Sequence, residues 1–106
     1  MSAHSIAEVY AALTRVPVHP RIHPTEAARI VVENILPPFE VVPIAKRDYV
    51  TVLKNMRDEG FSGAKIYDAL SLRCASNCEP EWIYTFNLAD FRQLASPALQ
   101  HRICAP

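Results

Sequence analysis

The sequence has no long apolar run. Its longest apolar stretches, such as residues 30–32, cover only a few residues, far short of the roughly 20 that a membrane-spanning helix needs. The first residues have neither the basic cluster nor the apolar core of a secretory signal peptide. Three cysteines, an odd number, fit a reducing compartment better than a disulfide framework. We therefore expect a cytoplasmic protein without a membrane helix.

An excess of charge is also missing, because 11 basic residues balance 11 acidic ones. Composition alone therefore does not indicate a nucleic-acid binder, which would meet phosphates with a basic surface. Contact with a phosphodiester would need local basic residues or a bound metal ion. Half of the 106 residues are hydrophobic, which predicts one small domain with a packed core rather than disorder.

Glycine is scarce and proline frequent, with two and nine residues respectively. Apolar periodicity predicts helices over residues 5–14, 24–34, 46–59, 63–77 and 88–95. Pro24 suits a first helical position, Gly60 a residue just past a helix end, and Ser62 an N-cap. Short apolar runs predict strands over 39–44, 82–86 and 102–104. The faces expected to be buried are Ile6, Val9, Tyr10 and Leu13 in the first helix, and Tyr49, Val52, Leu53 and Met56 in the third.

Helices that alternate with short apolar strands indicate an α/β fold with a parallel sheet. The strands near Val41 and Ile83 should belong to this one sheet. The helix over residues 63–77 is apolar almost all round, which predicts a central, buried position. Two or three strands cannot cover five helices, so we expect part of the sheet to be missing or supplied by another chain.

Asp68 stands out because it shares a helix face with Ala64, Leu72 and Ala75. A carboxylate on an apolar stripe is costly unless it is compensated. It could pair with an arginine, cap a neighbouring backbone, or bind a metal ion.

Polar residues also gather where the strand over 82–86 gives way to a helix. Thr85, Asn87 and Asp90 lie there, and sites of parallel sheets form outside the carboxyl ends of strands. Asn87 could instead cap the helix, with Asp90 in its first turn. Glu8, on the first helix, is a further candidate, although most helix glutamates are solvated. Together these oxygens would suit Mg²⁺ or Mn²⁺, which could activate water and stabilise charge on a phosphodiester.

Three segments resemble the PIN-domain family in family order. Residues 5–10 resemble the helix that presents a glutamate, and residues 63–70 resemble the helix in which an aspartate precedes alanine. Residues 85–91 are similar to the signature of threonine, aspartate or asparagine, and aspartate–phenylalanine. The resemblance covers nearly all of residues 1–106 and implies a three-layer α/β/α fold.

The resemblance also implies a Mg²⁺- or Mn²⁺-dependent endoribonuclease of the VapC toxin type, held inactive by a small antitoxin. Glu8, Asp68 and Asn87 would hold the metal, Asp90 would support them, and Thr85 would orient the site. RNA would be the substrate, and a homodimer is possible.

The sequence departs from the family at its beginning. No strand with the family's first catalytic aspartate precedes Glu8, and residues 1–4 could at best end the following strand. We expect either a start further upstream or a catalytically incomplete remnant that only binds a partner.

A zinc site is a rival interpretation of the cysteines and histidines. Cys74 and Cys78 lie four residues apart, and His101 and Cys104 lie three apart, so four soft ligands could form a tetrahedral site. His19 and His23 form a weaker pair in an irregular loop.

Overall fold

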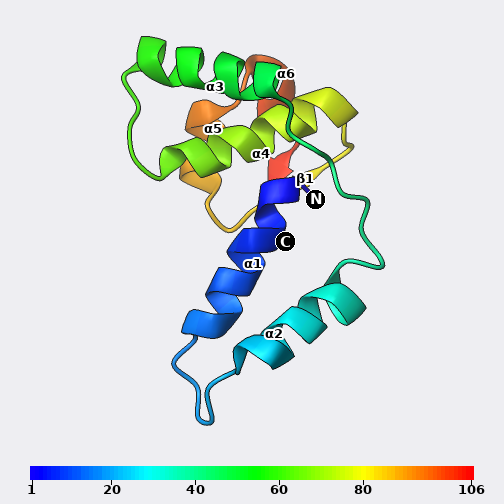
Figure 1. The fold of residues 1–106 in the computed structure, drawn as a ribbon. Coiled ribbons are helices and arrows are strands. Elements are labelled where there is room, and N and C mark those ends of the chain that lie inside the picture. Colours follow the sequence, from blue (N-terminus) through cyan, green and yellow to red (C-terminus); the bar gives the residue numbers. More distant parts are fainter. The chain divides into compact units, whose positions relative to one another are not determined.

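The structure is a computed structural model that describes residues 1–106, and the chain divides into two compact units, Met1–Pro43 and Ile44–Pro106. Figure 1 shows the course of the chain through both. The expectation of a single domain over the whole chain stays a prediction. None of the helices is both long enough and apolar enough to cross a membrane.

The first unit consists of three helical segments and one strand-like bridge. Helix α1 spans Ala3–Arg15, α2 spans Pro24–Ile30, and the π-helical turn η1, Val31–Ile35, continues α2. Pro24 occupies the first turn of α2 as predicted, and the N-cap His23 accepts the Thr25 N–H through Nδ1 at 3.2 Å. Both expected helices of this unit are therefore confirmed.

The predicted strand over residues 39–44 is wrong. Only a single parallel bridge forms, between Ser2 and Val42. Its two bonds run from the Ala3 N–H to the Val42 carbonyl and from the Val42 N–H to the Met1 carbonyl, both 2.8 Å. An apolar run becomes a strand only where a neighbouring backbone pairs with it, and here one residue finds such a partner.

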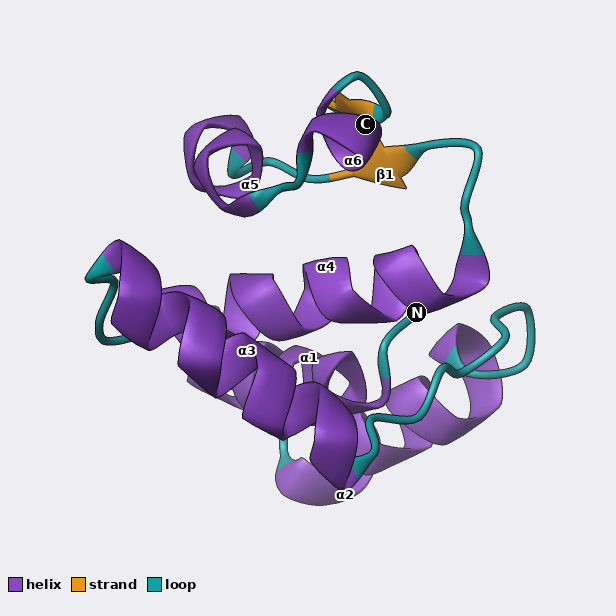
Figure 2. Ribbon diagram, turned by 90° about the horizontal axis from the view of Figure 1, so that it is seen from above, coloured by secondary structure: helices purple, strands orange, loops and turns teal.

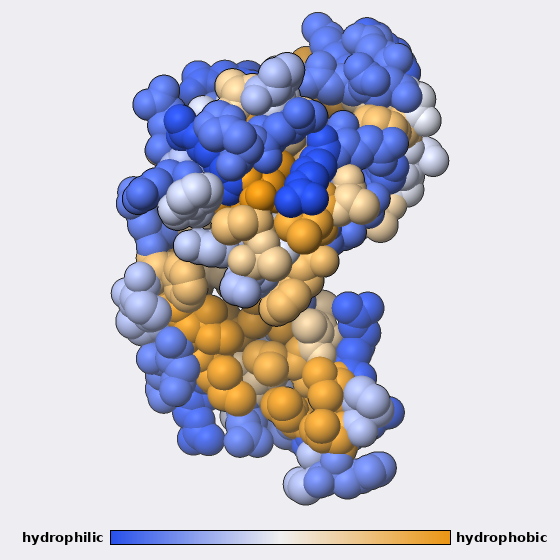
Figure 3. Space-filling view, turned by 180° about the vertical axis from the view of Figure 1, so that it is seen from behind, coloured by the Kyte–Doolittle hydropathy of each residue, from blue (hydrophilic) through white to orange (hydrophobic).

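The first unit buries few apolar side chains. Its buried hydrophobic residues are Ala27 and Val31, while no residue of α1 is fully buried. Tyr10, expected on the buried face of α1, is 38% exposed. Figure 3 shows apolar side chains over the surface of the α1–α2 region.

The second unit is built around α4, which spans Lys65–Cys78. Helix α3, Lys46–Glu59, packs on α4, and so does α5, Leu88–Leu94. Figure 2 shows α3 on one side of α4, with α5, the short helix α6 (Pro97–Gln100) and the strands on the other. The predicted central position of this helix is confirmed.

Two apolar clusters hold this unit together. One joins Leu72 of α4 to Phe91 and Ala95 at α5 and to Ile103. The other joins Leu70 to Val52 and Met56 of α3. The predicted face of α3 is half right, because Tyr49 and Leu53 are 41% and 53% exposed. Asp48 is buried in their place and shares a face with Val52 and Met56.

The strands form a small parallel sheet. Strand β1, Ile83–Tyr84, pairs with β2, Ile103–Cys104, with Ile83 opposite Ile103. The α/β class with a parallel sheet is thus confirmed in this unit, within which the sheet has two strands. The bridge at Val42 belongs to the other unit, so the expectation that it shares a sheet with Ile83 stays a prediction.

The turn between α3 and α4 differs from the expected one. Gly60 ends α3 with a φ of 70°, as predicted for a residue just past a helix end. Ser62, however, does not cap α4. Gly63 follows with a φ of 69°, and Ala64 becomes the N-cap without a side-chain bond. A residue with positive φ cannot continue a right-handed helix, so α4 begins two residues later than predicted.

Candidate functional site

Three of the predicted site residues meet in the second unit. The Asn87 side-chain amide donates two hydrogen bonds through Nδ2, to Asp68 Oδ2 at 3.0 Å and to Asp90 Oδ2 at 2.9 Å. Asp68 lies in the first turn of α4 and Asp90 in the first turn of α5. Two carboxylates that are 22 positions apart in the numbering thus converge on a single nitrogen. We call these three residues the carboxylate–amide cluster.

The local backbone explains how Asn87 reaches both acids. Asn87 occupies the N-cap position of α5, and its carbonyl accepts the Phe91 N–H at 3.1 Å. Its side chain makes no capping bond. The prediction that Asn87 is the N-cap residue is therefore confirmed, but its side chain does not cap the helix. The Asn87 N–H donates to Thr85 Oγ1 at 3.0 Å. Thr85 therefore holds the backbone of Asn87 in place, while its role in a metal site stays a prediction of the family resemblance.

Packing behind the cluster fixes its framework. Phe91 follows Asp90 directly, is only 8% exposed, and packs with Leu72 of α4. The cluster itself is reached by solvent, since Asn87 is exposed and both aspartates are half-buried. The cluster also lies just beyond the carboxyl end of β1, where parallel sheets place their ligands.

The electrostatics of the cluster favour a positive partner. Two carboxylates that share one amide group repel each other unless a donor or a cation offsets their charge. The amide nitrogen now offers its hydrogens to both. A half-turn of the same amide would replace the nitrogen with Oδ1, an oxygen ligand. Two carboxylates and an amide oxygen are ligands of the kind that Mg²⁺ and Mn²⁺ take.

Glu8 is not part of this described cluster. It lies on α1 in the first unit, its side chain is 51% exposed, and its Oε1 lies 3.0 Å from His4 Nε2. Its convergence with Asp68 stays a prediction. No group of three or more His, Cys, Asp or Glu side chains is placed to hold a metal ion. The cluster has two acids, and its third member is an asparagine.

The structure reveals an ion pair between a buried aspartate and a half-buried arginine that the sequence did not single out. Asp48 is 3% exposed and accepts the Arg73 Nε–H at 2.8 Å, the Asn77 amide at 3.2 Å and the Ala45 N–H at 3.0 Å. The Arg73 bond, then those from Ala45 and Asn77, lower the pKa of Asp48 from 3.8 to about 2. Because these bonds tie the start of α3 to α4, this acid holds the fold together. The signal in the sequence was an acid at the third position of a predicted helix, three residues after the N-cap Ala45.

A cleft elsewhere in the second unit was also not predicted. It has a volume of about 540 Å³ and lies among α3, α4 and the α5–α6 segment. Its apolar lining includes Val52, Met56, Phe61, Leu94 and Leu99. The carboxylate–amide cluster does not line this cleft, so the cluster and the cleft are separate features.

The zinc interpretation is not supported. Cys74, Cys78, His101 and Cys104 do not gather into a metal-binding group. Cys74 is 3% exposed, and burial raises the pKa of its thiol. The Cys78 thiol donates to the Cys74 carbonyl at 3.1 Å. Cys74 and Cys78 are therefore free cysteines of one helix that pack as small side chains and not as metal ligands.

Comparisons with known proteins give no relative. No protein-family model, no curated protein and no solved structure matches the chain.

Proposed function

We propose that this protein is a Mg²⁺- or Mn²⁺-dependent endoribonuclease of the PIN-domain type, resembling the toxin of a toxin–antitoxin pair. The observation that supports this best is the Asn87 amide held between Asp68 and Asp90, at 3.0 Å and 2.9 Å. The resemblance named these residues from their order in the sequence, and contacts between them are what a shared metal site requires.

The proposed metal ligands are Asp68, Asp90 and the Asn87 amide oxygen, and the family resemblance adds Glu8 to them. Thr85 holds Asn87 in place through its hydroxyl. A divalent ion at such a site supplies an activated water and offsets charge on a phosphodiester. The protein's own part is to fix these oxygens in advance, which Phe91 and Thr85 do from either side of Asn87.

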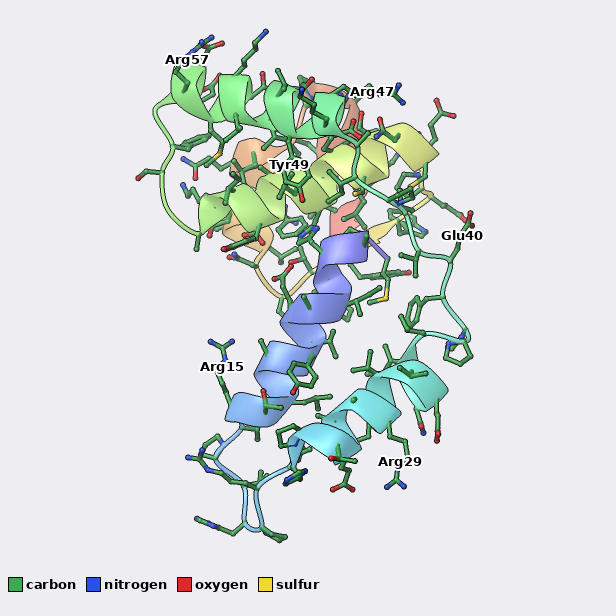
Figure 4. The ribbon with its side chains drawn as sticks, viewed as in Figure 1. Arg15, Arg29, Glu40, Arg47, Tyr49 and Arg57 are labelled. Atoms are coloured by element: carbon green, nitrogen blue, oxygen red, sulfur yellow. The ribbon has the colours of Figure 1, made fainter.

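A bound cation also fits the charge of the chain. The net charge is zero, and the basic residues are spread along the sequence. Arg47 and Arg57, for example, lie at opposite ends of α3 (Figure 4). Because the chain has no net positive charge to attract phosphates, RNA would be held at the site chiefly through the metal ion.

The proposal includes a three-layer fold with a further strand carrying another acid. The second candidate function is a catalytically incomplete PIN-like protein that only binds a partner, such as a small antitoxin. The observation that favours it is that the cluster contains two acids and no third, which gives a divalent ion little negative charge.

The test measures cleavage of a structured RNA by the purified chain with Mg²⁺, with Mn²⁺ and with a chelator. A version extended upstream by the natural reading frame is assayed in parallel. The informative variants are Asp68→Asn, Asp90→Asn and Glu8→Gln. Asp58→Asn is a matched control, since Asp58 is an exposed acid that pairs with Arg57 on α3.

We expect metal-dependent cleavage that is stronger in the extended form, that is lost in the three site variants and that survives in Asp58→Asn. Full activity of the short chain would show that a further strand is not needed. Inactivity of both forms with every metal would favour the partner-binding protein. A cleavage rate that is unchanged in Asp68→Asn would refute the proposed site.

A further inference from the structure

Strand β1 has one edge without a partner strand. The sheet contains β1 and β2 alone. The Ile83 N–H bonds the Arg102 carbonyl at 2.8 Å, and the Thr85 N–H bonds the Cys104 carbonyl at 3.1 Å. Alternate residues of a strand direct their backbone groups to opposite edges. Tyr84, between these two, therefore directs its N–H and C=O away from β2.

The same segment exposes three aromatic side chains. Trp82, Tyr84 and Phe86 are 51%, 63% and 94% exposed, whereas Ile83 and Thr85 between them are half-buried. This alternation is that of a strand with one solvent-facing side. An open edge beside exposed aromatic residues is a template for another strand, and isolated two-stranded sheets are marginal.

We propose that a second copy of this chain pairs with the edge, strand β1 against strand β1, antiparallel around a two-fold axis at Tyr84. The pairing is self-complementary, as an isologous contact requires. Tyr84 lies opposite its own counterpart, and the two exchange both outward backbone bonds. In this register Trp82 lies opposite Phe86 of the second copy, and such aromatic pairs stabilise antiparallel strands. The product is a four-stranded sheet with β2 at each outer edge.

The exposed area sets the strength of this dimer. With roughly 150–250 Å² for each aromatic side chain, the three exposed fractions amount to on the order of 400 Å² per chain. Stable interfaces bury about 800 Å² per partner. The dimer is therefore weak and depends on concentration, with a dissociation constant in the micromolar range or above. This proposal does not rest on the nuclease activity.

The first experiment follows the mass of the whole chain by sedimentation velocity from about 1 µM to about 1 mM. Phe86→Lys should weaken dimerisation by more than about tenfold, because a mostly exposed ring adds little to the monomer but would be buried in the dimer. Phe39→Lys, which alters a ring that is 53% exposed in the first unit, is the matched control. The proposal is overturned if the chain stays monomeric over this whole concentration range, or if Phe86→Lys leaves the dissociation constant of the dimer unchanged.

Cross-linking tests the register. In a background with Cys78→Ser and Cys104→Ser, which also removes the thiol that the sheet register places opposite residue 84 in the same chain, Tyr84→Cys should form an intermolecular disulfide, since bonded antiparallel pairs have Cα atoms about 5.5 Å apart. Trp82→Cys should not, because its counterpart lies about four residue steps away, roughly 13 Å. Tyr84→Pro, which removes only an outward N–H, should abolish the dimer and keep the helical circular dichroism. Equal cross-linking at residues 82 and 84 would refute the register.

Discussion

Truncation of Phe91 tests whether the second unit has the core described above. Phe91 is 8% exposed and packs with Leu72, Ala95 and Ile103, so it joins α5 and β2 to α4. Phe91→Ala removes a buried ring and leaves a cavity, a change that typically costs about 3–5 kcal/mol. Phe91→Leu keeps most of the volume and should cost less than about 1.5 kcal/mol.

The size of the unit makes this cost decisive. Residues 44–106, at about 0.05–0.15 kcal/mol per residue, have a free energy of unfolding of roughly 3–9 kcal/mol. Phe91→Ala should therefore leave the unit marginally folded or unfolded at 25 °C, while Phe91→Leu stays folded. Leu53→Ala is the control, because Leu53 is 53% exposed on α3 and should cost less than about 1 kcal/mol.

The assay is urea unfolding followed by far-ultraviolet circular dichroism, since helices α3, α4 and α5 dominate this unit. Both Phe91 variants are compared with the parent at one protein concentration. If Phe91→Ala costs no more than Leu53→Ala, then α5 does not pack on α4 through Phe91, and the framework assigned to the carboxylate–amide cluster is wrong.

Three further predictions concern other parts of the chain. Asp48→Asn should lower the melting temperature at neutral pH. Because the folded-state pKa of Asp48 is about 2 and its usual value is 3.8, the stability it provides is present above pH 4 and is lost as pH falls towards 2, so melting curves of parent and variant should converge in acid. A thiol reagent should modify Cys78, which is exposed, well before Cys74, which is buried with a raised pKa; equal rates would contradict the packing of α4. Gly60→Ala should lower the free energy of unfolding in urea by about 1 kcal/mol, because Gly60 has a φ of 70°, which strains any residue with a side chain. An added Cβ would meet no other atom within 4 Å, so the cost comes from the backbone alone. An unchanged midpoint would refute the left-handed helix end.

Helix positions could be predicted because they depend on local patterns. The apolar spacing along residues 46–59 gave the bounds of α3, and Pro24 and Gly60 marked a helix start and a helix end. These signals act within a few residues of where they are read. Strands were predicted less well, since pairing decides them. The residues around Val42 have the composition of a strand but form one bridge.

Part of the candidate site was predictable for a similar reason. Asp68 was conspicuous on an apolar helix, and Asn87 and Asp90 lay at a strand-to-helix junction. Their meeting depends on how α5 packs on α4, which no spacing in the sequence encodes. The role of Asp48 was missed because its partner Arg73 lies 25 residues away. Pairing with an arginine, one of the roles that the sequence allowed for Asp68, is the role that Asp48 has in the structure.

Direct measurement of Mn²⁺ binding tests the central claim that Asp68, Asn87 and Asp90 form one site for a divalent ion. Mn²⁺ is titrated into the whole protein and bound ion is followed by electron paramagnetic resonance, with Mg²⁺ as competitor. We predict one site, weakened more than about tenfold in both Asp68→Asn and Asp90→Asn, because each change removes a charged ligand. Asp58→Asn should bind as the parent does. Equal Mn²⁺ binding by the parent and both site variants would contradict the account.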